Sequence, residues 1–142
     1  MKTTKLNLTF FTIVFAALFL FLFFSTNNFS NPNGKDWKVP GIAKKIKNPV
    51  PSTQLSIKLG KKLYAQSCAI CHGESGIGDG AAGKYLGKKV TDLTSKTVTD
   101  QEDGVLFYKI SKGRAPMPAF KTILKTKQRW AVINYLRTLK SN

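Results

Sequence analysis

The residues best able to do chemistry in this 142-residue chain lie together in Cys68-Ala69-Ile70-Cys71-His72, which holds both cysteines and the single histidine. The spacing Cys-x-x-Cys-His is typical of covalent haem attachment. On one helical turn the two cysteines share a face, so both thiols can reach the vinyl groups along one edge of a porphyrin. The imidazole of His72 can then turn toward the iron. We therefore predict one covalently bound haem c, attached through Cys68 and Cys71, with His72 as the proximal iron ligand.

Other uses of the two cysteines are less favoured. A thioredoxin-like redox pair follows a strand in a βαβ unit, whereas the residues before Cys68 look helical. A disulfide closing so short a loop stabilises little. A Cys/His zinc site needs four ligands, and the chain has three such residues. Thiol–disulfide chemistry stays the most distant alternative.

A second iron ligand is predicted at Met117, the only methionine after Met1. Pro116 and Pro118 flank it and restrict the backbone on both sides. An ordered loop of this kind suits a weak thioether ligand, whereas a methionine that fills a core gap usually lies on a periodic helix. Lys112 or Lys121 is the fallback ligand, and an open iron site is the further alternative.

The elements that must position these residues are predicted to be helical. Apolar spacing favours helices over about 52–71, 100–112 and 126–139, with a glycine-rich loop over 73–87 and no strand alternation. Residues 52–142 are therefore predicted to form one all-α domain. Three helices in 91 residues bury a marginal core, which suggests that a cofactor fills the centre.

The N-terminal part of the chain is predicted to be a targeting segment followed by a linker. Two lysines precede an uncharged apolar run over residues 8–24, so residues 1–24 are predicted to be a signal sequence or an uncleaved membrane anchor. Residues 25–51 are rich in Asn and Pro and are predicted to be a linker, although Trp37 suggests packing onto the domain. The expected location is the periplasmic side of the bacterial inner membrane, anchored by the N-terminus, or the soluble periplasm after cleavage.

The charge balance favours acidic partners. The chain has 23 Lys+Arg against 7 Asp+Glu, a net +16. With export and no nucleic-acid-binding motif, the expected partners are redox proteins with acidic docking faces rather than nucleic acid. A solvated basic surface without a docking role is the alternative.

Taken together, these motifs resemble the class I c-type cytochromes, the small bacterial mono-haem proteins, over residues 54–140. The likeness rests on the following residues: Gly60 and Tyr64; Cys68, Cys71 and His72; Gly76, Gly78, Asp79 and Gly80; Gly113, Arg114, Pro116, Met117, Pro118 and Phe120; Trp130, Val132, Ile133, Tyr135, Leu136 and Arg137. The resemblance implies about three to five helices wrapped around one haem, with the first and last helices crossing at Gly60. The proline that often precedes Asp92 in the family is missing.

The expected function is outer-sphere one-electron transfer between respiratory redox partners. An iron held by both His72 and Met117 has no open position, so neither a small-molecule substrate nor enzymatic activity is expected. The alternatives are a fixed haem subunit of a membrane respiratory complex and, less favoured, a haem protein that binds a gas or peroxide.

Overall fold

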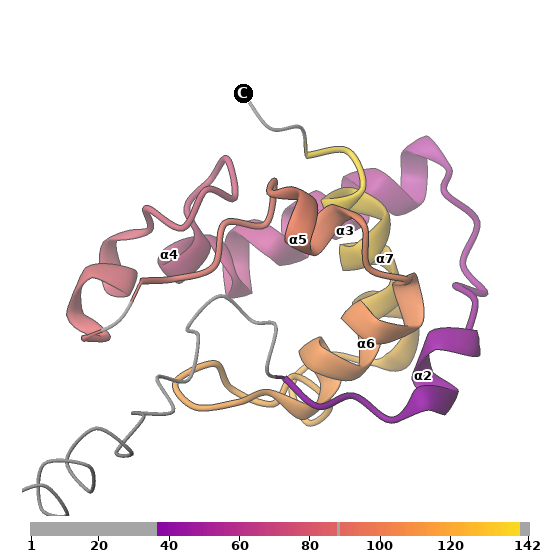
Figure 1. Ribbon diagram of the computed structural model, residues 1–142. Coiled ribbons are helices and arrows are strands. Elements are labelled where there is room, and N and C mark those ends of the chain that lie inside the picture. The colour runs from indigo at the N-terminus through magenta and orange to yellow at the C-terminus, as the bar shows by residue number, and fades with distance from the viewer. Residues whose placement is uncertain (1–36, 88, 140–142) are drawn as a thin grey trace, which may run out of the picture. The chain divides into compact units, whose positions relative to one another are not determined.

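The computed structural model describes residues 37–87 and 89–139. The predicted signal or anchor, residues 1–24, lies outside these ranges. Six α-helices and one 3-10 helix are found in the described residues, and no strand, so the all-α prediction is confirmed (Figure 1). In chain order they are α2 (Gly41–Lys45), α3 (Gln54–Ser67), α4 (Ala69–His72), η1 (Ala81–Tyr85), α5 (Lys96–Thr99), α6 (Asp103–Lys112) and α7 (Thr126–Leu136).

Helices α3 and α7 cross in close contact, as expected of the first and last predicted helices. A Cβ atom built on Gly60 would lie 2.0 Å from the carbonyl oxygen of Ala131 and 2.9 Å from the Cβ of Tyr135. The ring of Tyr135 in turn meets the ring of Tyr64, with centroids 5.2 Å apart. Since no side chain fits between the two backbones, glycine at position 60 sets the distance between the helices.

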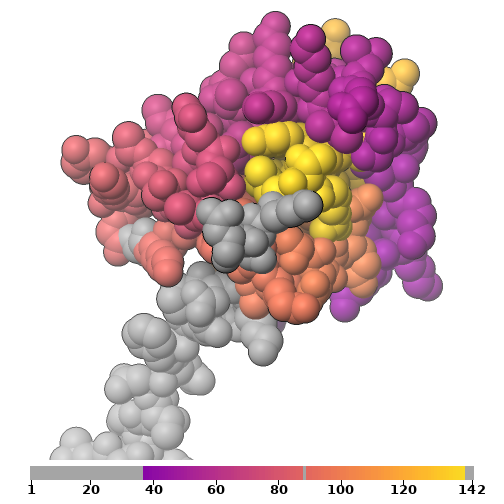
Figure 2. Space-filling view, turned by 90° about the horizontal axis from the view of Figure 1, so that it is seen from above, coloured from indigo at the N-terminus to yellow at the C-terminus, as the bar shows by residue number. Residues whose placement is uncertain are grey.

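The core lies along α7, whose residues 129–136 are all buried. The yellow end of the described chain lies between magenta and orange segments in the space-filling view (Figure 2). The helix ends at Leu136 rather than near residue 139. Beyond it the chain tightens into i→i−3 hydrogen bonds, from the Thr138 amide to the Tyr135 carbonyl (2.8 Å) and from the Leu139 amide to the Leu136 carbonyl (3.1 Å).

The other two long helices also have local causes for their limits. Thr53 caps α3, because its hydroxyl accepts from the Ser56 amide while its own amide donates to the Ser56 hydroxyl. The predicted helix over 52–71 is interrupted at Cys68, which has φ −120° and separates α3 from α4. Helix α6 begins at Asp103, later than predicted, and ends at Lys112 before Gly113, whose φ is 62°.

The predicted linker contains a helix. Residues 41–45 form α2, and Ala43 at its centre is buried. Trp37 also contacts the domain, as its aromatic character suggested. None of the helices in the described ranges has the length and apolarity that crossing a membrane requires.

Candidate functional site

The segment that carries the two cysteines follows α3 directly and is hydrogen-bonded to its last turn. The Cys68 amide donates to the Tyr64 carbonyl (2.8 Å), and the His72 amide donates to the Cys68 carbonyl (2.9 Å). Cys68 thus lies at the junction of α3 and α4 rather than within one continuous helix. Both cysteines are free and partly exposed. This geometry presents two thiols and one imidazole within a single short helical segment.

All four predicted site residues line one cavity. Its wall includes Cys68, Cys71, His72 and Met117. The cavity has a volume of about 230 Å³. The rest of the wall is largely apolar and includes Leu93, Val98, Leu106, Ile110, Phe120, Val132 and Leu136. The tertiary structure therefore brings residues from α4 and from the loop after α6 to the same space.

The imidazole of His72 is oriented by a backbone carbonyl. Its Nδ1 lies 3.0 Å from the carbonyl oxygen of Thr91. Because a carbonyl only accepts, Nδ1 carries the proton and Nε2 keeps its lone pair for a metal. Burial lowers the pKa of His72, and the bond to Thr91 acts in the opposite direction. The ring is therefore suited to act as a neutral donor through Nε2.

The thiol of Cys68 is a poor candidate for redox exchange on its own. Burial raises its pKa to about 12, and the nearby Cys71 acts in the same direction. Thiol–disulfide exchange proceeds through the thiolate, which such a pKa makes scarce at neutral pH. The raised pKa thus disfavours Cys68 as the attacking thiol in the thiol–disulfide alternative.

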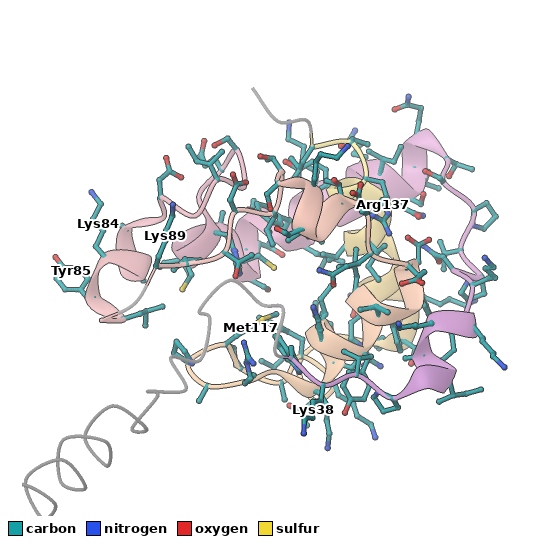
Figure 3. The ribbon with its side chains drawn as sticks, viewed as in Figure 1. Lys38, Lys84, Tyr85, Lys89, Met117 and Arg137 are labelled. Atoms are coloured by element: carbon teal, nitrogen blue, oxygen red, sulfur yellow. The ribbon has the colours of Figure 1, made fainter. Side chains whose placement is uncertain are left out.

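The loop that carries Met117 folds back onto the end of α6. The Phe120 amide donates to the Ile110 carbonyl (3.0 Å), and the amides of Arg114 and Met117 each donate to the other's carbonyl (3.0 Å). Figure 3 shows the Met117 side chain on this loop, directed toward the space between the loop and α4. The half-buried thioether therefore has a defined place in the cavity wall.

Basic and aromatic side chains lie beside the attachment segment. Lys84 and Tyr85 on η1 project outward, and Lys89 lies close by and also lines the cavity (Figure 3). Tyr85 is 89% exposed. Lys84 and Lys89 thus supply positive charge close to α4, and Lys89 does so at the cavity wall.

The sequence analysis did not predict that several other residues would line the cavity or orient its ligands. Trp37, Lys109 and Gln101 contribute to the cavity wall, and the carbonyl of Thr91 orients His72. A tryptophan in a polar segment was the one available signal for Trp37. A backbone acceptor has no residue-type signature, so nothing in the sequence could have identified Thr91 in this role.

The donor set fits covalent haem c better than a bare metal ion. No group of three or more His, Cys, Asp or Glu side chains suited to a metal is found within the described ranges. One imidazole, one thioether and two thiols line a mostly apolar cavity instead. Thiols that can bond a porphyrin edge, together with two soft or borderline iron ligands, match what a c-type haem needs.

Comparison with known proteins agrees with this chemistry. The family described as "Cytochrome C oxidase, cbb3-type, subunit III" matches residues 56–136. The chain is 45% identical over 38 residues to the thiosulfate dehydrogenase of Stutzerimonas stutzeri (strain A1501), covering 27% of this chain and 12% of that protein. A solved chain of the reducing HAO-like protein complex of Kuenenia stuttgartiensis aligns with TM-score 0.57 and 28% identity, covering 66% of this chain and 47% of that one. The chain thus spans less than half the length of either relative.

Proposed function

This chain belongs to the family of c-type cytochrome domains that includes subunit III of cbb3-type cytochrome c oxidase, and on that premise we propose which residues hold its covalent haem c and what it exchanges electrons with. The family makes it a haem electron-transfer protein. We assign Cys68 and Cys71 as the attachment residues, His72 as the proximal iron ligand and Met117 as the distal one. The observation that carries this assignment is that all four line a single apolar cavity.

Each residue has a separate task in this assignment. The two thiols would hold the cofactor covalently, His72, oriented by the Thr91 carbonyl, would offer Nε2 to its iron, and Met117 on its hydrogen-bonded loop would offer a thioether sulfur. Bound haem supplies an iron that alternates between the ferrous and ferric states one electron at a time. With His72 and Met117 both as iron ligands, the metal would keep no position for a substrate, and electron transfer would be outer-sphere. The apolar wall excludes water and disfavours the additional positive charge of the ferric state.

The partners we propose are respiratory redox proteins with acidic docking faces. Lys84 and Lys89 lie close to α4, Lys89 lines the cavity, and the whole chain has a net charge of +16. Complementary charge steers encounter and raises the association rate. We place the protein on the periplasmic side of the inner membrane, held there by residues 8–24 or released after cleavage.

The ligand assignment is tested on protein expressed with a haem-attachment system. Sharp reduced α and β bands with a weak ferric methionine–iron band are expected in the wild type. Met117→His is expected to keep covalent haem but lower the midpoint potential by on the order of 0.1 V, within the roughly 0.8 V over which axial ligands tune haem. A Met117→His potential equal to that of the wild type would contradict ligation by Met117.

The docking proposal is tested by stopped-flow reduction of an acidic redox protein at increasing ionic strength. The association rate is expected to fall with salt, and Lys84→Gln combined with Lys89→Gln is expected to weaken that dependence. Lys44→Gln on α2 is the matched control, because it removes an exposed lysine away from the cavity rim. A flat salt dependence in the wild type would contradict steering.

A second candidate function is that of a fixed haem subunit in a larger assembly. It is favoured by the likeness to a chain solved as part of a complex. Stable co-purification with other subunits from native membranes would support it over a mobile carrier. Ready binding of carbon monoxide by the native ferrous protein would instead support the gas-binding alternative.

A further inference from the structure

Residues 37–51, which we call the N-terminal strap, precede the segment that the family matches, yet they have a defined position on the domain. Helix α2 of the strap lies beside α6 (Figure 1), where a Cβ built on Gly104 would come 2.0 Å from the carbonyl oxygen of Ala43. Further along, the Asn48 amide donates to the side-chain oxygen of Asn134 on α7 over 2.7 Å. The strap is thus held at two separate places.

The strap brings Trp37 to the haem cavity. Its half-buried ring contributes to the cavity wall, together with Arg114 and Lys109. The guanidinium carbon of Arg114 lies 4.7 Å from the ring centroid, and the amine nitrogen of Lys109 lies 5.6 Å from it. Cations within about 6 Å of an indole face are attracted by the ring quadrupole.

No carboxylate side chain forms an ion pair with Arg114 or Lys109 within the part of the chain that the structure describes. The one ion pair there joins Arg137 to Asp103. Lys109 also donates to the side-chain oxygen of Gln101 over 2.7 Å. The Arg114 side chain thus lies against the indole of Trp37, a residue of the strap.

Arg114 is in turn tied to Met117 through the backbone. The amide of each residue donates to the carbonyl of the other, and both bonds are 3.0 Å long. A contact that limits the movement of Arg114 consequently limits how far the loop can carry Met117 out of the cavity.

We propose that Trp37 is a positioning residue for Met117, through which the strap clamps Arg114 and keeps the thioether in the haem cavity. This inference rests on the proposed ligation by Met117. Without the indole, the loop opens more often. An added ligand that competes with Met117 binds during opening, so its apparent affinity rises with the open fraction.

The test is a titration of the ferric, haem-loaded full-length protein with imidazole, followed by absorption. Trp37→Ala is expected to lower the apparent Kd about 3- to 10-fold and to weaken the methionine–iron band. Trp37→Phe retains an aromatic face and is expected to stay closer to the wild type. Arg114→Gln acts through the same contact, so it should lower the Kd as well, and the double variant should fall no further than the stronger single one.

Tyr85→Ala is the matched control, because it removes an aromatic side chain that is 89% exposed and lies on η1. It is expected to keep the wild-type Kd. If the wild type shows the methionine–iron band but Trp37→Ala binds imidazole with the wild-type Kd, the positioning role of Trp37 is overturned and the ligand assignment stands. A wild type without that band would overturn the ligand assignment as well. Should Trp37→Ala fail to fold, Arg114→Gln with a wild-type Kd would overturn the inference.

Discussion

The Nδ1 nitrogen of His72 lies 3.0 Å from the carbonyl oxygen of Thr91, a contact that joins the attachment segment to the chain that follows η1. The two residues are separated by the glycine-rich loop, so the bond depends on how that loop folds. It selects the Nδ1–H tautomer and turns Nε2 toward the cavity.

This tautomer can be observed directly. In the haem-loaded ferrous protein we expect a His72 Nδ1 proton that exchanges slowly with solvent, because it is hydrogen-bonded and buried. Nitrogen-15 and proton NMR of protein labelled at histidine gives an unambiguous reading, since the chain has one histidine. A proton on Nε2 instead would contradict both the bond to Thr91 and iron ligation through Nε2.

Gly60→Ala should disrupt the crossing of α3 and α7. The added methyl would lie 2.0 Å from the Ala131 carbonyl oxygen, so the backbones must separate. We expect a loss of about 1–3 kcal/mol, even though alanine favours helix over glycine. Chemical denaturation measures the change.

The control for that substitution is Gly41→Ala, where a Cβ would meet nothing within 4 Å. It should leave the free energy of unfolding unchanged or slightly higher. Equal stability of Gly60→Ala and Gly41→Ala would show that α3 and α7 can part without cost.

Asn134 joins the N-terminal strap to the core. Its amide donates to the Ser56 hydroxyl (3.0 Å) and to the carbonyls of Val50 (3.1 Å) and Pro51 (3.2 Å), and its oxygen accepts from Asn48 (2.7 Å). Because Asn134 is buried, Asn134→Ala removes these bonds from the interior and should cost about 1–3 kcal/mol.

A double-mutant cycle with Asn48→Ala isolates the direct bond between the two amides. The coupling energy should be at least about 0.5 kcal/mol, as for residues in one hydrogen-bond network. Additive losses would mean that the strap is held by α2 and Trp37 without this bond.

Tyr64 should make stability depend on pH in the alkaline range. Its hydroxyl donates to the Gly73 carbonyl over 2.6 Å, and burial, followed by nearby Cys68, Tyr135 and Asp79, raises its pKa. The folded state therefore keeps a proton that the unfolded chain loses near pH 10, so wild-type stability falls as pH rises above about 10.

Tyr64→Phe removes both the bond and the titration. It should be about 1 kcal/mol less stable than the wild type at neutral pH, and the gap should narrow above about pH 10. Denaturation of the reduced proteins between pH 7 and 11 checks this, with Tyr85→Phe controlling for loss of an exposed hydroxyl. A gap that widens with pH would mean that the phenol does not hold its proton in the folded state.

Short-range sequence patterns predicted the parts of the site that are local. Cys68, Cys71 and His72 lie within one helical turn, so their spacing alone places them together. Met117 was predicted as a ligand because its flanking prolines set it apart from a helix, and the structure places it in the cavity wall. The long helices α3, α6 and α7 were also predicted, because apolar residues at helical spacing indicate which face of a helix is buried.

Other features of the fold could not be predicted from propensity or apolar periodicity. The interruption at Cys68 and the early ends of α3 and α7 follow from local hydrogen bonding that propensity does not resolve. The helix α2 and its contact at Gly104 lay inside a predicted linker, because five residues with one buried alanine carry no periodic signal.

The sequence alone was sufficient to predict a covalently bound haem c and the all-α class, because both predictions follow from residue types at fixed short spacing. The tertiary structure decided which groups surround that chemistry: the carbonyl of Thr91 on His72, the indole of Trp37 against Arg114, and the strap on α6. These contacts join residues far apart in the chain, and two of them use backbone atoms that every residue possesses. Their positions follow from packing of the whole domain, which no local pattern encodes.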